Sequence, residues 1–247
     1  MLIKAILVAI WVTWAFIDEH TLQLQTTRAI ITGPVVGAIL GDPHTGLIVG
    51  ATVEMMFLGA VFVGTAVAPD VTLASAWATA FAVAAGGDTS VAIASALAVA
   101  ILGQTMSTLQ FSFVNVAILH WVEAGKKQGD INRVRMGTYL ALALDALFYG
   151  VPTFLAVYFG ASKVAALMDA MPEKLLTGLS NGGAMLAAVG FGMLLTTIKN
   201  KKLWPYFAVG YIAAAFVNLG NVGIGLLAVT CAFLHKYFLD MSKKGAE

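Results

Sequence analysis

The chain has 247 residues, of which 60% are hydrophobic and only 11% are charged. Soluble domains carry about 25% charged residues, so this composition excludes an ordinary soluble domain and indicates an integral membrane protein. The formal net charge of +1, without basic residues interleaved with aromatic ones, argues against a nucleic-acid partner, and the single cysteine, Cys231, excludes a disulfide within one chain.

The apolar segments of the first half are short or broken. Gly, Pro and Asp are frequent in the breaks, as in GDPHTG, APD and GGDTS. At membrane depth such interruptions are tolerated only where they line a cavity enclosed by protein, and transporters use them to build substrate sites; the alternative is ordinary helices joined by tight turns. We therefore predict a broken-helix, site-rich half, 1–122, of a single membrane domain, with apolar segments at 2–16, 29–40, 46–68, 71–85 and 91–122.

The second half, 123–247, has the pattern of regular transmembrane helices. Its four apolar segments, 135–160, 175–198, 203–219 and 222–239, are each near the ~20 residues that a spanning helix needs. Basic residues cluster on one side of these spans. By the positive-inside rule that side is the cytoplasm, which predicts a cytoplasmic C-terminus. The three clusters are Lys126, Lys127, Arg133 and Arg135; Lys199, Lys201 and Lys202; and Lys236, Lys243 and Lys244.

Glu54 lies near the middle of the apolar run 46–68, in the stretch ATVEMMFLGA. An ionisable residue at the centre of a membrane helix costs about 2.5–3.5 kcal/mol on insertion scales, so it is a candidate for function. One interpretation is a ligand contact in a cavity. The other is a protonated glutamate that bonds to a neighbouring helix and is purely structural.

An acidic pair and an amide follow the first apolar segment. Asp18 and Glu19 end the segment, and Gln25 lies shortly after them in WAFIDEHTLQLQ. An acidic pair at a helix end can simply be solvated. Carboxylates and amides together, however, are what a polyhydroxylated ligand requires, because each can bond two adjacent hydroxyls.

Three further polar residues have two interpretations each. Asp70 follows a proline and opens an apolar run, where it either caps a helix or faces a site; in a broken-helix transporter these roles coincide. Gln104 and Asn181 are amides within apolar segments, which bond neighbouring helices or a ligand. Asp145 is interpreted as structural. The sequence has no His-Glu-x-x-His pair, catalytic Ser-His context or phosphate-binding glycine loop, so we predict no metal, cofactor or catalytic residue.

Residues 33–70, GPVVGAILGDPHTGLIVGATVEMMFLGAVFVGTAVAPD, resemble the signature region of IIC subunits of mannose-family sugar phosphotransferase systems. That family has an LGD-x-x-TG turn, a G-x-x-x-E-M/L segment and a small-residue run that ends before an acid. The resemblance extends upstream to IDE and downstream through DAMPEKLLTGLSNGGAMLAAVGFGMLL, and so covers essentially the whole chain. Many relatives have a His-Arg-Pro stretch after the acidic pair, whereas QLQTTRAIITGP retains only Arg28, a departure that concerns substrate preference.

The resemblance implies an all-α polytopic protein of the bacterial cytoplasmic (inner) membrane that pairs with a homologous IID membrane subunit. IIC–IID pairs form an oligomer in which a mobile core moves against a static scaffold, as in elevator-type transporters. They import a hexose or amino sugar (mannose, fructose, sorbose or N-acetylgalactosamine), which a cytosolic IIB domain, itself phosphorylated by IIA, phosphorylates on arrival. The hydroxyl ligands that the resemblance implies are Glu54, Asp70, Asp18, Glu19 and Gln25.

The residues alone leave three other functions open. An ion-coupled secondary transporter would use Glu54 as a proton or sodium site. An intramembrane enzyme would use Glu54 and Asp70 as a carboxylate pair, although no nucleophile or metal motif accompanies them. A structural scaffold predicts that neutralising Glu54 changes stability but not transport.

Overall fold

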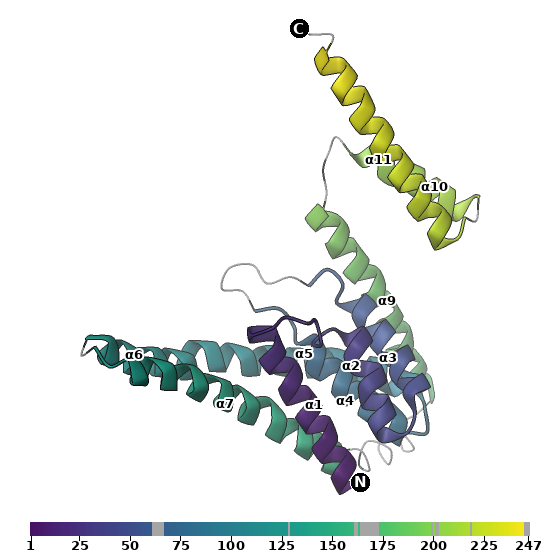
Figure 1. Ribbon diagram of the computed structural model, residues 1–247. Helices are drawn as coiled ribbons and strands as arrows, with labels where there is room; N and C mark the ends of the chain where they lie inside the picture. Colours follow the sequence, from purple (N-terminus) through teal and green to yellow (C-terminus); the bar gives the residue numbers. More distant parts are fainter. Residues whose placement is uncertain are drawn as a thin grey trace. The chain divides into compact units, whose positions relative to one another are not determined.

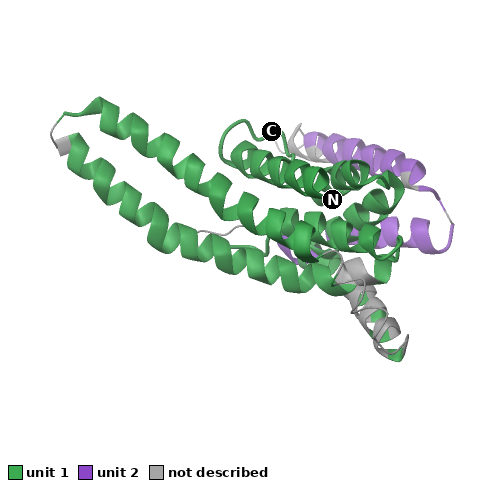
Figure 2. Cartoon of the chain, turned by 90° about the horizontal axis from the view of Figure 1, so that it is seen from below, with its two compact units in different colours: residues 1–194 green, residues 195–247 purple. Residues whose placement is uncertain are grey.

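The computed structural model describes residues 1–60, 67–127, 129–160, 163, 173–198, 200, 203–217 and 219–244. Within these residues the regular secondary structure is helical and includes no strand, which confirms the all-α prediction (Figure 1). The chain forms two compact units, residues 1–194 and 195–247 (Figure 2). The first unit contains all seven candidate site residues.

Three of the first helices are too short to cross a bilayer. Helices α2, α3 and α4 have 12, 14 and 14 residues, or about 18–21 Å, against a hydrocarbon core of ~30 Å. The prediction of short, interrupted segments is confirmed for them. The apolar run 46–68 is not one helix, because α3 ends at Met56 and the described residues 57–60 and 67–70 are not helical. The bounds are α1 Leu2–His20, α2 Ala29–Leu40, α3 Pro43–Met56, α4 Val71–Ala84 and α5 Thr89–Leu109.

Glycines allow the backbones of α2 and α3 to touch. A Cβ atom on Gly33 would overlap backbone atoms of Gly46 and Gly50 in α3, so no larger side chain fits between the two helices. The two helices form a tight hairpin, which we call the α2–α3 hairpin. Its open end brings together Arg28, just before α2, and Glu54, in the last turn of α3.

The tip of the α2–α3 hairpin is held by capping groups. Gly41 ends α2 with a left-handed φ of 105°, a conformation that favours glycine. Lys4 of α1 donates a hydrogen bond to the Leu40 carbonyl at this helix end. Asp42 then caps α3, since its carboxylate accepts from the Thr45 backbone N–H at 3.0 Å. The turn is therefore fixed at both helix ends.

Hydroxyl groups of α4 fasten it to the start of α2. Thr72 Oγ1 donates to the Thr27 carbonyl at 2.9 Å, and Ser75 Oγ donates to the Ala29 carbonyl at 3.2 Å. These bonds fix the open end of the α2–α3 hairpin on α4. The first helices pack through two clusters of mostly small and medium-sized buried side chains; Val8, Val12, Val36 and Leu73 belong to one, and Val49 and Val53 to the other.

Two longer helical stretches complete most of the first unit. Among the described residues, Ala94–Lys126 and Ile131–Gly160 are helices long and apolar enough to cross a membrane. They match the predicted segments 91–122 and 135–160. Their outer parts, α6 and α7, lie side by side as a long hairpin (Figures 1 and 2). The stretches consist of α5, the π-helix η1 (Gln110–Val114) and α6 (Asn115–Lys127), then α7 (Ile131–Leu155) and the π-helix η2 (Ala156–Gly160).

Helix α9 (Glu173–Ile198) begins in the first unit, where Gly190 lies against the backbone of Met55 and Met56 at the end of α3. The second unit contains α10 (Trp204–Ala215) and α11 (Asn221–Lys244). Tyr206 and His235 join these two helices through a 2.8 Å hydrogen bond. The predicted segments 175–198, 203–219 and 222–239 therefore correspond to helices. The second basic cluster, Lys199, Lys201 and Lys202, lies outside the described residues.

Candidate functional site

A cavity of about 680 Å³ lies in the first unit, at the open end of the α2–α3 hairpin. Its walls are the end of α1, the loop that follows, the end of α3 and the start of α4, with side chains from α5, η1 and α7. The volume is typical of a small-molecule site. Five of the seven predicted site residues line it: Asp18, Glu19, Gln25, Glu54 and Asp70.

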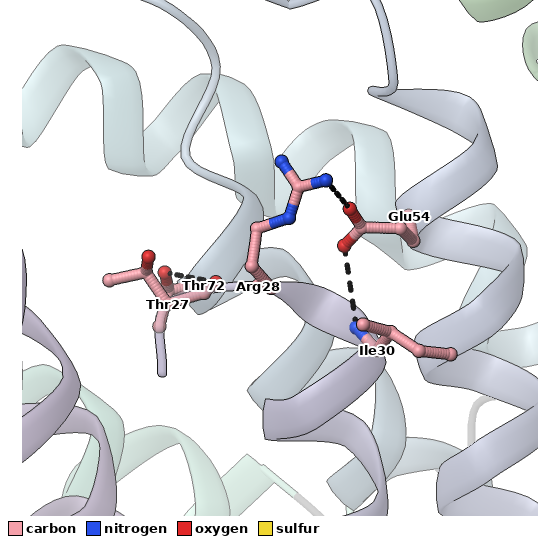
Figure 3. Close-up of polar contacts among 5 residues, drawn as sticks. All are labelled: Thr27, Arg28, Ile30, Glu54 and Thr72. Carbon is pink, nitrogen blue, oxygen red and sulfur yellow. Dashed lines mark hydrogen bonds and ion pairs between the residues drawn. The ribbon is translucent and has the colours of Figure 1, made fainter. Parts of the chain in front are cut away.

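Glu54 forms an ion pair with Arg28 in the cavity wall (Figure 3). Glu54 Oε1 is 2.7 Å from Arg28 Nη2, and Oε2 accepts a hydrogen bond from the Ile30 N–H at 3.4 Å. The Glu54 side chain is 14% exposed and that of Arg28 is 51% exposed. The carboxylate therefore lies in the last turn of a short helix, not in the middle of a membrane span. It is tolerated because a cation and a free backbone N–H at the start of α2 face it.

Asp70 caps α4 and also faces the cavity. Its carboxylate accepts a hydrogen bond from the Leu73 N–H at 2.9 Å, and its own N–H donates to the Ala100 carbonyl at 3.0 Å. A Cβ atom on Gly103 would overlap the Asp70 side chain, so α5 accommodates Asp70 with a glycine. The capping role is confirmed, and the geometry leaves the second role, as a ligand contact, open.

Asp18 is 1% exposed and bonds the loop that follows its own helix. Its Oδ1 accepts from the Leu24 N–H at 2.8 Å. Its Oδ2 accepts from the Thr26 N–H at 3.1 Å and from Thr26 Oγ1 at 2.7 Å. Both carboxylate oxygens are thus occupied by the protein, although the residue lines the cavity.

Glu19 and Gln25 present polar groups that the protein itself does not use. Glu19 is partly buried and Gln25 is exposed to the cavity side. Within the described part of the chain, neither side chain takes part in a hydrogen bond. Gln23 of the same loop also lines the cavity and donates from Nε2 to the Glu19 carbonyl at 3.4 Å. Among the described residues, the side chains of Glu19 and Gln25 are therefore free to bond a ligand.

Side chains that the sequence did not single out complete the cavity. Tyr149 of α7 stacks on Phe16 of α1, with ring centroids 3.5 Å apart, and its hydroxyl is 2.7 Å from Ser107 Oγ of α5. All three line the cavity. Ser107 also donates to the Gly103 carbonyl of its own helix. Since serines in apolar helices commonly make that bond, nothing in the sequence distinguished Ser107 as a cavity residue.

Two predicted site residues do not line the cavity. Gln104 Nε2 donates to the Val67 carbonyl at 2.6 Å and so holds the segment that leads into Asp70. Asn181 has an exposed side chain on α9. Asp145, interpreted as structural, is 6% exposed on α7 and also lies outside the cavity lining.

Comparison with known proteins gives a consistent result. The family model described as "PTS system sorbose-specific IIC component" matches residues 2–234. The chain is 32% identical to the fructose permease IIC component of Bacillus subtilis (strain 168), over 87% of this chain and 80% of that protein. Two solved structures, each 30% identical, are similar to it. A structure titled "Structure of membrane protein" has a TM-score of 0.86 and coverage of 95% of both chains. The mannose transporter ManYZ in complex with microcin E492 has a TM-score of 0.62 and coverage of 96% of both chains.

Proposed function

Since this chain belongs to the family of sorbose-type IIC components of sugar phosphotransferase systems, and is thus a multi-pass protein of a bacterial membrane, we propose that it binds one hexose or amino sugar in the cavity and carries it inward. The sugar is of the mannose, fructose, sorbose or N-acetylgalactosamine type. A cytosolic IIB partner, charged by IIA, phosphorylates it.

The observation that carries this proposal is the composition of the cavity wall. Carboxylates and amides from three separate parts of the chain, Glu19, Gln25, Glu54 and Asp70, face one volume suited to a small molecule. Each can bond neighbouring hydroxyls of a sugar. Phe16, stacked on Tyr149 in the same wall, adds an apolar surface. Asp18 is not in the proposed ligand set, because both of its carboxylate oxygens bond the loop that forms this wall. Gln104 and Asn181 are also left out, because they do not line the cavity.

The same family membership supports the rest of the assembly. We propose that the chain pairs with a homologous IID membrane subunit in an oligomer of such pairs, in the cytoplasmic membrane, with its C-terminus in the cytoplasm. The similar mannose transporter bears the paired name ManYZ, which supports a two-subunit membrane complex. A core that moves against a scaffold, as in elevator-type transporters, would carry the cavity from one side of the membrane to the other.

An ion-coupled transporter is the alternative. It would use Glu54 as a proton or sodium site, but Glu54 is already paired with Arg28 at 2.7 Å. The guanidinium group of Arg28 thus occupies the position beside the Glu54 carboxylate that a transported proton or sodium ion would need. The pairing therefore favours the phosphotransferase proposal.

Uptake into membrane vesicles that contain this chain and its IID partner tests the proposal. A panel of labelled sugars is offered with and without phosphoenolpyruvate and the soluble phosphotransfer proteins. We expect phosphorylated sugar to accumulate only in the complete system. Glu54→Gln should reduce this uptake, whereas Glu123→Gln, an exposed glutamate of α6 outside the cavity, should not. Accumulation of free sugar driven by an ion gradient would refute the proposal.

A further inference from the structure

The loop between α1 and α2 has an unusual backbone on the wall of the cavity. Gln23 and Gln25 adopt φ of 54° and 66°. They are the only residues other than glycine with positive φ in the described part of the chain. This left-handed region costs free energy for any residue that has a Cβ atom. Such conformations persist only where surrounding contacts impose them, and they are frequent at functional sites.

Asp18 supplies the contacts that impose this conformation. Its two oxygens accept three hydrogen bonds, from the Leu24 N–H, the Thr26 N–H and Thr26 Oγ1, at 2.7–3.1 Å. The bonded N–H groups belong to residues 24 and 26, which alternate with the two left-handed residues. The buried carboxylate of Asp18 therefore bonds the residues on both sides of Gln25 and the residue that follows Gln23.

The far end of the loop is held independently. Thr32 Oγ1 of α2 donates to the Thr26 carbonyl at 2.9 Å. Thr72 Oγ1 of α4 donates to the Thr27 carbonyl at 2.9 Å, a bond that Figure 3 shows. The near end is held as well, because the N–H groups of Thr21 and Gln23 donate to the backbone carbonyl of Asp18 at 3.2 and 2.8 Å. The carboxylate of Asp18 is the group that fixes the segment between these two ends, through the N–H groups of residues 24 and 26.

We propose that Asp18 is a positioning residue, which does not touch the sugar but holds the loop so that the amides of Gln23 and Gln25 form a specificity-determining wall of the cavity. An amide both donates and accepts hydrogen bonds, so this wall discriminates between sugars that differ in the arrangement of their hydroxyl groups. Holding it in advance removes the cost of ordering the loop when the sugar binds. This inference rests on the proposed function for the identity of the ligand, but its structural part does not.

The first test measures the loop without sugar. The full chain, purified with its IID partner in lipid nanodiscs, is studied by amide hydrogen exchange. Asp18→Asn should speed the exchange of the Thr26 amide at least tenfold, because the single oxygen of asparagine can still accept from Leu24 whereas its NH2 group, which only donates, then faces the Thr26 N–H. The matched control is Asp88→Asn, since Asp88 also accepts from a backbone N–H and a hydroxyl, both of Ser90, but lies outside the cavity lining. It should leave the loop unchanged. Normal protection of the loop in Asp18→Asn would overturn the proposal.

Glycine provides a rescue that separates positioning from direct contact. Gln23→Gly and Gln23→Ala remove the same amide, but only glycine adopts a φ of 54° without strain. In the Asp18→Asn background, Gln23→Gly should therefore restore more protection of Thr26 than Gln23→Ala. Equal behaviour of the two double variants would show that backbone strain is not what Asp18 controls.

The second test measures the sugar. Gln25→Ala should raise the KM for uptake about three- to tenfold, the loss of one or two neutral hydrogen bonds, while leaving loop protection intact. Asp18→Asn should raise KM more than it lowers the maximal rate, and Asp88→Asn should leave KM unchanged. An unchanged KM in Gln25→Ala would overturn the specificity role. A wild-type complex without phosphoenolpyruvate-dependent uptake would refute the proposed function instead, whereas the exchange measurement would still decide the role of Asp18.

Discussion

Gly33→Ala should loosen the α2–α3 hairpin and, with it, the cavity. The new Cβ atom would lie 2.6 Å from Gly50 Cα and 2.9 Å from Gly50 N, and would overlap the Gly46 carbonyl oxygen. Carbon atoms prefer to be about 3.5–4.0 Å apart, so the helices must separate by roughly 1 Å. These are backbone atoms, which cannot rotate away as a side chain would.

The expected magnitude combines two opposing effects. Overpacking of a close contact costs about 1–3 kcal/mol, and replacing glycine by alanine within a helix returns up to about 1 kcal/mol. Because the crowded atoms belong to the backbone, the cost should lie in the upper part of its range, about 2–3 kcal/mol; less a gain of about 1 kcal/mol, the expected net loss is about 1–2 kcal/mol. Gly192→Ala in α9 is the matched control, because nothing lies within 4 Å of its Cβ position. It should show only the stabilisation that alanine gives over glycine within a helix.

Thermal unfolding of the purified protein measures this difference. At about 2–4 °C per kcal/mol for a chain of this size, Gly33→Ala should melt roughly 2–8 °C below the wild type, and Gly192→Ala at or above it. Sugar affinity should also fall in Gly33→Ala, since the helices that carry Arg28 and Glu54 move apart. If Gly33→Ala and Gly192→Ala melt at the same temperature, the backbone contact between α2 and α3 is not present, and the hairpin does not shape the cavity as described.

Three further predictions concern individual side chains. In a double-mutant cycle of Arg28→Gln and Glu54→Gln measured by thermal unfolding, the coupling free energy between the two side chains should be about 0.5–1 kcal/mol and should shrink in high salt, because Arg28 is half exposed. A coupling free energy near zero would contradict the ion pair. Asp70→Ala and Asp42→Ala should each cost about 1 kcal/mol in thermal unfolding as lost helix caps, but only Asp70→Ala should raise the KM for sugar, and equal KM values would refute its cavity role. Asn181→Ala should leave uptake unchanged, since its side chain is exposed on α9; a loss of uptake would return it to the ligand set.

Helix limits could be predicted from the sequence where the chain itself carries the stop signal. Segment 29–40 matches α2 and segment 71–85 matches α4 within one residue, because GDP and APD end or begin a helix by local chemistry alone. The end of α3 could not be predicted in this way. Residues 57–60 are as apolar as the helix before them, and α3 ends where α9 packs against Gly59.

Which acids gather at one cavity was predictable, but what each acid bonds was not. Asp18, Glu54 and Asp70 have equally polar side chains, yet one binds its own loop, one an arginine and one a helix end. Only the cap of Asp70 is made within one helical turn of the sequence, since its partner is Leu73. The Arg28–Glu54 pair exists because a glycine-packed hairpin brings two distant positions together, a tertiary effect that no local pattern contains.

The shortness of α2 and α3 also constrains how the chain enters the membrane. Neither helix can remain alone in lipid, because its ends would leave unbonded backbone groups in the hydrocarbon. The Thr27 carbonyl, which precedes α2 and so lies outside its helical hydrogen bonds, is bonded by Thr72 of α4, which the ribosome makes later. During biosynthesis the start of the hairpin therefore lacks this hydrogen-bond partner until α4 has emerged.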